Sequence, residues 1–495
     1  MKKFKTLIID FVVISLILVI AIFLVAFSKF EWMEATIVCL LIYVINCIFV
    51  SFSVINNDTY EEKIAWIFFL ILFPIIAHIF YALFRARRDI GISREAYEQE
   101  IAEFQFQPNH LTTPSCELSE FEIHQQRLTN RKFYPCEIKL YPHGFDAYQD
   151  LIQDLKKAQK FIHIEMYILK PSEIFEIIKE ILIKKVAQGV EVKMIVDDFG
   201  SWKVAQKNFD YLVSKGIKIV KFNRTIYPFV RHTDNKRLHR KFFVIDGQVV
   251  HYGGLNIADE YGSFNSKYGY WADLNFRSEG QIVNEYETIF LYDWFKLTKE
   301  KLDKRHYTLN PKLKNQTTKV LLFDEGPNNY DNLLERLINH WIGNSVKSIK
   351  IATPYFVPTQ QIFKTLESVV KIGVDVEIFI PGLPDKKFVY KATKHYLYKL
   401  QQLGVKVKIL NNIFLHSKLV IFDDKFAYIG TNNLDMRSLY SNYEAIVITT
   451  GSEIITQLND VFCQYHKISY DLDQKSSKFR LKFDEFLFRI LAPLM

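Results

Sequence analysis

Hydrophobic residues follow one pattern up to about residue 85 of this chain and another pattern after it. The first part holds three long apolar runs, at about residues 7–27, 36–55 and 65–84, each interrupted by only a few polar residues. A run of about 20 apolar residues matches a helix that crosses the hydrocarbon core of a bilayer. We therefore expect residues 1–88 to form an N-terminal helical transmembrane region that anchors the chain.

Basic residues beside these runs give conflicting indications of orientation. Three lysines within residues 1–5 favour a cytoplasmic N-terminus, whereas three arginines within residues 85–88 favour a cytoplasmic start for the part that follows. Three full crossings cannot satisfy both, so the first run is alternatively a re-entrant or interfacial segment. A cleaved signal peptide is disfavoured, because the first run is too long and lacks a clean small-residue cleavage site. Giving weight to the arginines, we expect a multi-pass membrane protein whose remaining part lies on the cytoplasmic face.

After residue 88 the apolar stretches become short and alternate between helix and strand periodicity. Residues 89–135 are polar and mixed in charge, and we interpret them as a linker, with a short helix at 96–106, that folds onto the part after it. Amphipathic helices then alternate with apolar strands, which is typical of an α/β protein with a largely parallel core. The expected helices are 145–158, 174–188, 330–344, 361–372 and 452–465, and the expected strands are 161–169, 190–197, 348–356 and 374–380.

The elements from residue 136 onward occur twice, in a first half (136–310) and a second half (311–495). Gly189-Val190-Glu191-Val192 matches Gly373-Val374-Asp375-Val376, and Gly216-Ile217-Lys218-Ile219 matches Gly404-Val405-Lys406-Val407. Each matched glycine ends a predicted helix and precedes a predicted strand. This internal repeat predicts two similar α/β halves that meet at a pseudo-twofold interface.

A short polar motif occurs once in each half. His239-Arg240-Lys241 begins an H-x-K-x-x-x-x-D pattern that ends at Asp246, and His416-Ser417-Lys418 begins the same pattern, which ends at Asp423. A small-residue turn that ends in Asn follows each copy, Gly253-Gly254-Leu255-Asn256 and Gly430-Thr431-Asn432-Asn433. A single copy fits a chance occurrence at the edge of a buried strand. Two copies with the same downstream turn favour a functional pair.

The spacing within each motif suits phosphate chemistry. If residues 240–245 and 419–422 are strands, the His and the Lys of each motif lie on one face, because strand side chains alternate. Together the two copies offer one imidazole as nucleophile, another as general acid or base, and two ammonium groups for phosphate oxygens. We interpret the pair as a site that cleaves and remakes a phosphodiester without a metal or another cofactor.

Composition and charge narrow the class of partner only in part. The net charge of +8 favours an anionic partner, either lipid headgroups or nucleic acid. The cysteines show no metal-ligand spacing, and we expect free thiols at Cys39, Cys47, Cys116, Cys136 and Cys463. The tail at 479–495 alternates apolar with basic residues, so it either packs on the body or lies on the bilayer as an amphipathic helix.

The two motifs and their surroundings resemble those of the phospholipase D superfamily. Further stretches that carry the resemblance are 253–261, 270–273, 353–358, 380–385 and 433–438. With the three apolar runs, the chain is similar to bacterial cardiolipin synthases along nearly its whole length. The resemblance implies a duplicated phospholipase D-like α/β fold whose two halves share one active site.

The resemblance also implies roles for individual residues. His239 and His416 would carry the chemistry, with His239 the favoured nucleophile. Lys241 and Lys418 would bind the non-bridging phosphate oxygens, Asn256 and Asn433 would add donors, and Asp246 and Asp423 would fix the local framework.

Two acidic residues are candidates for orienting the histidines. Glu444, in Asn442-Tyr443-Glu444, matches the N-x-E acid of the superfamily and is expected to hold His416. Asp273 is the weaker analogue, expected to hold His239, and a solvated or helix-capping carboxylate is the alternative for both. Gly254 stands where many members have Ser, so we expect the two halves to be chemically unequal.

The resemblance finally implies a bacterial membrane phosphatidyltransferase. One phosphatidylglycerol would donate its phosphatidyl group through a phosphohistidine to a second phosphatidylglycerol, giving cardiolipin and glycerol. The partners would be these lipids in the cell membrane, with no nucleic acid and no protein partner. The alternatives are a membrane-anchored phospholipase D or phosphodiesterase that uses water and, less favoured by the apolar runs, a nuclease. An inactive lipid-binding scaffold is disfavoured because both motifs are intact.

Overall fold

The computed structural model describes residues 94–105, 117–225, 236–264, 269–309, 318–327 and 332–473, together with residues 37, 40, 41, 44 and 48. The apolar runs 7–27 and 65–84, most of 36–55, and the tail 479–495 lie outside the described residues. No helix among the described residues is long and apolar enough to cross a membrane. Gly91–Thr225 and Lys236–Ser476 form one compact unit, which contains both halves of the repeat.

The first half is built on a mixed sheet. Its strands are β1 (Tyr134–His143), β2 (Phe161–Met166), β3 (Glu191–Asp197), β4 (Lys218–Phe222), β6 (Phe242–Ile245), β7 (Val249–Gly253) and β8 (Tyr270–Gly280). They pair in the order β4-β3-β2-β6-β7-β8-β1. Pairing is parallel from β4 to β2 and antiparallel from β2 to β1, so the sheet is less parallel than the sequence predicts.

The second half repeats this arrangement. Its strands are β9 (Lys319–Glu325), β10 (Ser348–Ala352), β12 (Asp375–Pro381), β13 (Lys406–Leu410), β15 (Leu419–Phe422), β16 (Phe426–Gly430), β18 (Asn442–Thr450) and β19 (Ser469–Asp471). Their order is β19-β13-β12-β10-β15-β16-β18-β9, which reproduces the first sheet and adds β19 at the edge. The predicted duplication is therefore present in the strand order.

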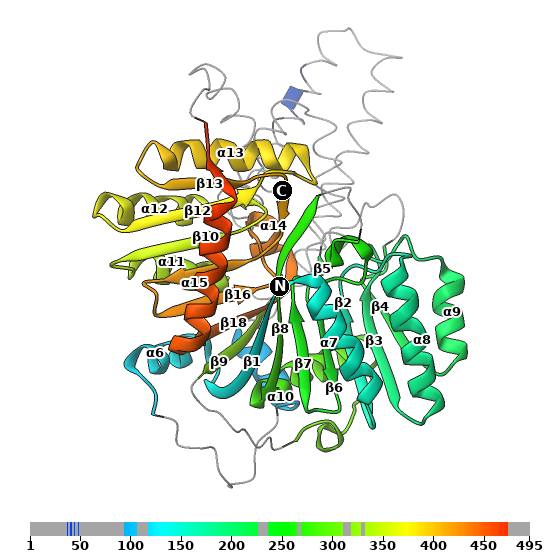
Figure 1. Cartoon of the computed structure of the whole chain (residues 1–495). Coiled ribbons are helices and arrows are strands. Elements are labelled where there is room, and N and C mark those ends of the chain that lie inside the picture. Colours follow the sequence, from blue (N-terminus) through cyan, green and yellow to red (C-terminus); the bar gives the residue numbers. More distant parts are fainter. Residues whose placement is uncertain are drawn as a thin grey trace. The chain divides into compact units, whose positions relative to one another are not determined.

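Helices cover both sheets and fill the space they share (Figure 1). Helices α7 (Gly144–Lys157), α8 (Glu173–Ala187) and α9 (Gln206–Ser214) pack on the first sheet, and α11 (Leu333–Gly343), α12 (Gln360–Lys371) and α13 (Lys387–Gln401) pack on the second. Helices α10 (Gln281–Thr298) and α15 (Ser452–Lys467) contribute to one hydrophobic core together with strands of both sheets. The two halves are thus fused into one unit, and burial of this common core stabilises their interface.

Three strand pairings join the halves directly. Strand β1 pairs with β9 at the sheet edges. Short strands flank both motifs: β5 (Arg237–Leu238) pairs with β18, and β14 (Ile413–Leu415) pairs with β8. Each motif therefore follows a strand that is hydrogen-bonded to the other half.

Most predicted elements are found within a few residues of their expected bounds. The glycines that end repeated helices adopt positive φ, 89° at Gly189 and 97° at Gly373, which glycine accepts without a Cβ penalty. The first motif strand begins at Phe242 rather than at Arg240, so His239 and Lys241 precede it. The linker holds two helices, α5 (Arg94–Ala102) and α6 (Glu120–Thr129), and α6 begins at a capping box on Ser119.

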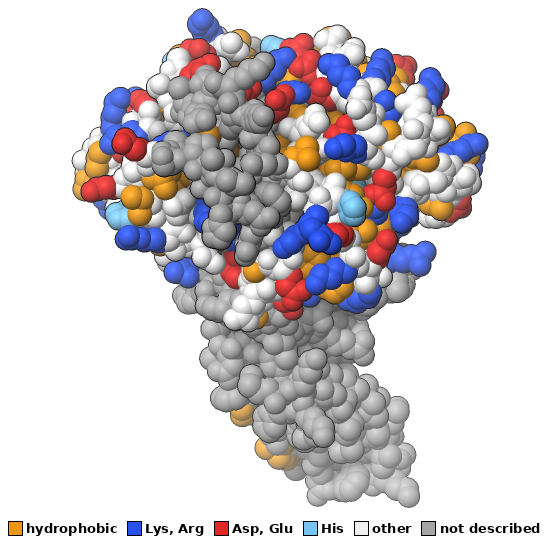
Figure 2. Space-filling view, turned by 90° about the horizontal axis from the view of Figure 1, so that it is seen from below, with side chains coloured by type: hydrophobic (Ala, Val, Ile, Leu, Met, Phe, Trp, Pro, Cys, Tyr) orange, Lys and Arg blue, Asp and Glu red, His pale blue; other side chains and the backbone are white. Residues whose placement is uncertain are grey.

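Charged side chains on the surface are mixed in sign. On the face in Figure 2, the described Lys and Arg side chains are interspersed with Asp and Glu. The net positive charge of the chain therefore forms no single basic field over the described part of this face. Two thiols in the described part, at Cys136 and Cys463, are free.

Candidate active site

Backbone hydrogen bonds hold each motif histidine against the opposite half. The His239 N–H donates to the Tyr443 carbonyl at 2.9 Å, and the His416 N–H donates to the Ala272 carbonyl at 2.7 Å. Each acceptor directly precedes an acidic residue, Glu444 or Asp273. The strand pairing thus delivers a carboxylate from one half to an imidazole of the other.

The carboxylate pairs are crossed between the halves. Nδ1 of His239 lies 2.8 Å from Oε2 of Glu444, and Nδ1 of His416 lies 2.6 Å from Oδ2 of Asp273. The expectation that Glu444 holds His416 and Asp273 holds His239 is therefore wrong, although both acids belong to the site. The sequence analysis assigned each acid to the histidine of its own half. In the fold, Glu444 lies on β18, which pairs with the strand before His239, and Asp273 lies on β8, which pairs with the strand before His416.

Both imidazoles are kept neutral by their surroundings. Burial, aided by the Lys241 and Lys418 charges, lowers the pKa of His239 to about 4, against the attraction of Glu444. Burial and the same two ammonium groups lower the pKa of His416 to about 4, against the attraction of Asp273. The ammonium of each motif thus acts on the imidazole of the other motif, so the two motifs lie close together.

The two lysines are buried cations in this site. Burial and the Lys418 charge lower the pKa of Lys241 to about 7, while burial lowers the pKa of Lys418 to about 8. Each ammonium donates to the backbone carbonyl of the histidine in its own motif. Each therefore retains donors for an anion, and a phosphate beside them would favour the charged form of both lysines.

The carboxylates are held by different means in the two halves. The Thr431 hydroxyl donates to Oε2 of Glu444, and the Asn442 amide donates to its Oε1 at 3.2 Å. Gly254 occupies the position equivalent to Thr431, where a Cβ would lie 2.1 Å from Oδ1 of Asp273. Asp273 thus occupies the space that a side chain at Gly254 would need. The expected inequality of the halves is therefore that Glu444 accepts a hydroxyl from Thr431, whereas Asp273 has no equivalent donor at Gly254.

The two asparagines are both buried beside the site but differ in their bonds. Oδ1 of Asn256 accepts the Ile168 N–H at 2.9 Å, which fixes the turn. The amide of Asn433 donates to the Ser438 hydroxyl at 3.3 Å, while its carbonyl oxygen is buried and makes no hydrogen bond with the described residues. Their role as phosphate donors stays a prediction.

The motif aspartates bind backbone and not the site. The Asp246 carboxylate accepts the N–H groups of Gln159, Lys160 and Phe161 at 2.7–2.9 Å. The Asp423 carboxylate accepts the equivalent N–H groups of Val346, Lys347 and Ser348 at 2.7–3.2 Å. Both aspartates have positive φ, near 54°, in the turn after the motif strand. These contacts agree with a framework role.

Aromatic residues line the site unequally. The Tyr167 ring lies 4.8 Å from the His239 ring and 5.2 Å from Nζ of Lys241. The rings of Tyr261, Trp271 and Phe414 lie 5.1–5.8 Å from the His416 ring. The sequence analysis included Tyr261 and Trp271 only as parts of motifs and assigned no role to Tyr167, which lies within the predicted strand 161–169.

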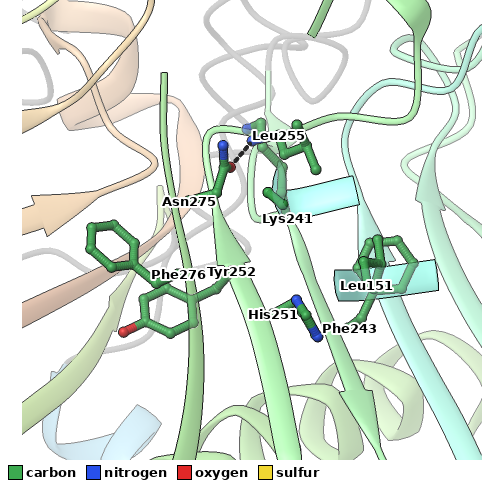
Figure 3. A pocket seen from close by; sticks show the side chains of 9 residues that line it. Leu151, Lys241, Phe243, His251, Tyr252, Leu255, Asn275 and Phe276 are labelled. Atoms are coloured by element: carbon green, nitrogen blue, oxygen red, sulfur yellow. Dashed lines mark hydrogen bonds between the residues drawn. The ribbon is translucent and has the colours of Figure 1, made fainter. Parts of the chain in front are cut away.

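Lys241 also lines a pocket between α7 and strands β6, β7 and β8. Figure 3 shows its side chain near Leu255 and Asn275, where Oδ1 of Asn275 accepts the Leu255 N–H at 2.9 Å. His251 lines the same pocket, and its Nε2 lies 2.8 Å from Oδ2 of Asp154, a pairing that accounts for it structurally. The pocket wall thus supports the aliphatic part of Lys241.

The arrangement provides what a stepwise phosphodiester displacement needs. One neutral imidazole can attack phosphorus, a second can exchange a proton with an alcohol, and two ammonium groups can hold the oxygens. Both imidazoles are oriented through Nδ1, which leaves Nε2 for the chemistry. No cluster among the described residues has the composition of a metal site.

The chain is similar to known proteins along most of its length. The family model described as cardiolipin synthase, PLD-like domain, matches residues 151–294 and 338–466, and the model described as phospholipase D-nuclease N-terminal matches residues 44–85. A cardiolipin synthase of Alkalihalophilus pseudofirmus is 34% identical, with 94% of this chain and 95% of that protein aligned. One from Geobacillus kaustophilus is 31% identical, with 97% and 99% aligned.

A solved structure shares the fold. The crystal structure of phosphatidylserine synthase from Haemophilus influenzae matches with a TM-score of 0.59 and 16% identity, and covers 76% of this chain and 100% of its own. At this identity the match supports the duplicated fold alone.

Proposed function

The chain belongs to the cardiolipin synthase family with phospholipase D-like domains, and from this membership we propose that it is a membrane-associated phosphatidyltransferase that makes cardiolipin. The observation that carries the proposal is the crossed pairing of His239 with Glu444 and of His416 with Asp273 around two buried lysines. One phosphatidylglycerol donates its phosphatidyl group, and the glycerol hydroxyl of a second accepts it.

The reaction proceeds in two displacements at phosphorus. In the first, Nε2 of one histidine forms a bond to phosphorus while the bond to the glycerol oxygen breaks, and the other histidine gives that oxygen a proton. In the second, the latter histidine removes the proton of the incoming hydroxyl, whose oxygen bonds to phosphorus as the phosphohistidine bond breaks. We assign His239 as nucleophile and His416 as acid and base.

Charged neighbours support each of these steps. Glu444 and Asp273 stay ionised. Burial raises the pKa of both carboxyls, but the partner imidazoles and the nearby lysines outweigh burial and hold each pKa below its usual value. Each carboxylate stabilises positive charge that develops on its imidazole. The bound phosphodiester anion raises the pKa of both the imidazoles and the ammonium groups, which prepares an acid for the leaving oxygen.

Transfer to a lipid, rather than to water, requires a partly dry site. His239 and His416 are each only 8% exposed, which is consistent with limited access for water. The three apolar runs would deliver both lipids by holding the enzyme in the bilayer, as a multi-pass protein with its catalytic part on the cytoplasmic face. Asn256 and Asn433 would lie beside the phosphate oxygens.

The test is incubation of the reconstituted protein with labelled phosphatidylglycerol in the presence of EDTA. Cardiolipin and free glycerol are expected from the wild type, while His239→Ala and His416→Ala each lose activity by about 10³-fold or more. Phosphatidic acid without cardiolipin would identify a hydrolase, and cleavage of DNA but not lipid would identify a nuclease. Near-full activity of either variant would contradict the shared site.

A further inference from the structure

Arg240 points out of the active site although it lies between two site residues. His239 and Lys241 both approach Tyr167, whereas the Arg240 guanidinium is buried and lies 2.5 Å from Oδ2 of Asp293 and 3.0 Å from Oδ2 of Asp324. Arg240 lies between β5 and β6, outside both strands, and its side chain points away from those of its two neighbours. A charged side chain on each face of this segment fixes its position from both sides.

Arg240 also reaches the partner of His239. Its Nε donates to the backbone carbonyl of Glu444 at 3.3 Å. The same residue thus adjoins His239 in the chain and holds the peptide that carries the carboxylate. A shift of the guanidinium would move the imidazole and its acceptor relative to each other.

The network behind Arg240 extends into the segment that follows the apolar runs. Asp324, on β9, accepts the hydroxyl of Tyr97 and lies 3.4 Å from Nη2 of Arg131, which in turn binds Glu98. Tyr97 and Glu98 belong to α5. The Tyr97 hydroxyl is buried, and its carboxylate partner keeps it a donor because burial and the Asp324 charge raise its pKa.

The second motif has a different arrangement. Ser417 occupies the position equivalent to Arg240, and its hydroxyl lies 2.8 Å from that of Tyr465 on α15. The same hydroxyl lies 3.5 Å from the Ala272 carbonyl of the first half, and both contacts are uncharged. The charged connection to α5 therefore distinguishes the His239 side from the His416 side.

We propose that Tyr97 and Asp324 are positioning residues for the His239–Glu444 pair and act through Arg240, which makes α5 part of the active-site support. Removal of the Tyr97 hydroxyl leaves the Asp324 carboxylate with one donor fewer. The carboxylate then binds the Arg240 guanidinium in a changed geometry. The inference rests on the proposed function, because its effect is expected on phosphatidyl transfer.

The test compares Tyr97→Phe with Tyr292→Phe in the full chain. Tyr292 is a matched control, since its ring packs edge-on against Tyr97 at 5.4 Å while its hydroxyl donates to Glu100, outside the network. We expect Tyr97→Phe to lower kcat about three- to tenfold with KM for phosphatidylglycerol within about twofold, and Tyr292→Phe to leave both near wild type. Rates are taken per mole of monodisperse protein, with the thermal midpoint of each variant.

A second variant keeps the idea testable if Tyr97→Phe folds poorly. Asp324→Asn preserves shape and removes one acceptor, and we expect it to lower kcat more than Tyr97→Phe does. Equal kcat for Tyr97→Phe and Tyr292→Phe, or a change confined to KM, would overturn the positioning role. A wild type that only hydrolyses phosphatidylglycerol would overturn the proposed function, and the ratio of the two tyrosine variants on that hydrolysis would still decide the positioning role.

Discussion

Nδ1 of His239 and Oε2 of Glu444 lie 2.8 Å apart although the two residues belong to different halves of the repeat. The reciprocal contact joins His416 to Asp273 at 2.6 Å. Each half therefore contributes an imidazole that the other half orients, and neither half contains a complete catalytic pair. The common core that joins the halves therefore also keeps the two residues of each pair together.

The crossed pairing predicts which variants should resemble each other. Glu444→Gln should impair the step that His239 performs, and Asp273→Asn the step that His416 performs, because each loses the acceptor that fixes its imidazole tautomer. A loss of about 10²–10⁴-fold in kcat is expected for each. Rapid quench with labelled lipid checks this. If His239 is the nucleophile and His416 the acid, both variants form phosphohistidine slowly, but only the defect of Asp273→Asn is relieved by a donor whose leaving group needs no proton. If such a donor relieved the defect of Glu444→Gln and not that of Asp273→Asn, the crossed arrangement would be wrong.

Gly254 should be intolerant of any side chain. A Cβ at this position would lie 2.1 Å from Oδ1 of Asp273, so Gly254→Ala should displace the carboxylate and misorient His416. We expect kcat to fall about tenfold or more, with a smaller effect on the unfolding midpoint. Thr431→Ser is the matched control in the other half, because it keeps the hydroxyl that binds Glu444. Full activity of Gly254→Ala would show that Asp273 can be displaced without consequence.

The buried lysines predict an alkaline limit to activity. The ammonium groups must be charged to hold phosphate, and in the free enzyme the pKa of Lys241 is about 7 and that of Lys418 about 8. The value of kcat/KM should therefore decline as pH rises through this range. On the acid side it should decline toward pH 4, where the imidazoles become protonated.

Bound substrate should move the alkaline limit upward, because an anionic phosphate stabilises the ammonium form. The limit in kcat is thus expected at higher pH than the limit in kcat/KM. Lys241→Arg should remove the contribution of this residue to the alkaline limb, since a guanidinium stays charged. A pH profile of the free enzyme that is flat from neutral pH to pH 10 would contradict this account.

The motif aspartates should affect stability more than chemistry. Asp246→Asn keeps the shape and tolerates the positive φ of this turn, but it replaces a carboxylate that accepts three backbone N–H groups. The expected loss is about 1–3 kcal/mol in the free energy of unfolding, with kcat per folded molecule near wild type. Denaturant unfolding of the two proteins measures the first, and lipid assays on the monodisperse fraction measure the second. A large fall in kcat with unchanged stability would place Asp246 in the chemistry instead.

Local sequence was enough to predict most of the elements that carry the site. The periodicity of residues 174–188 predicts α8 because its apolar positions recur on one helix face, and the repeated glycines mark helix ends because they accept positive φ. The segment 89–135 was less well predicted. Helix α6 begins at the local Ser119-x-x-Glu122 capping signal, which hydrophobic periodicity does not include, and Phe121 packs against Phe426 of the second half. The extent of parallel pairing was also overestimated, since alternation of helices and strands does not specify the antiparallel strands that follow each motif.

The sequence by itself predicted two histidines and two lysines for the candidate site, because the duplicated spacing repeats their chemistry, and the family resemblance added Glu444 and Asp273. Only the tertiary structure decided which acid meets which histidine. That choice depends on pairing of β5 with β18 and of β14 with β8, contacts between residues about 200 and 140 positions apart in the chain, for which local periodicity holds no information. The link from Tyr97 to Arg240 was likewise not predictable from local sequence. A buried guanidinium is stable only beside carboxylates, and the carboxylates that pair with Arg240 come from a strand and a helix distant in the chain.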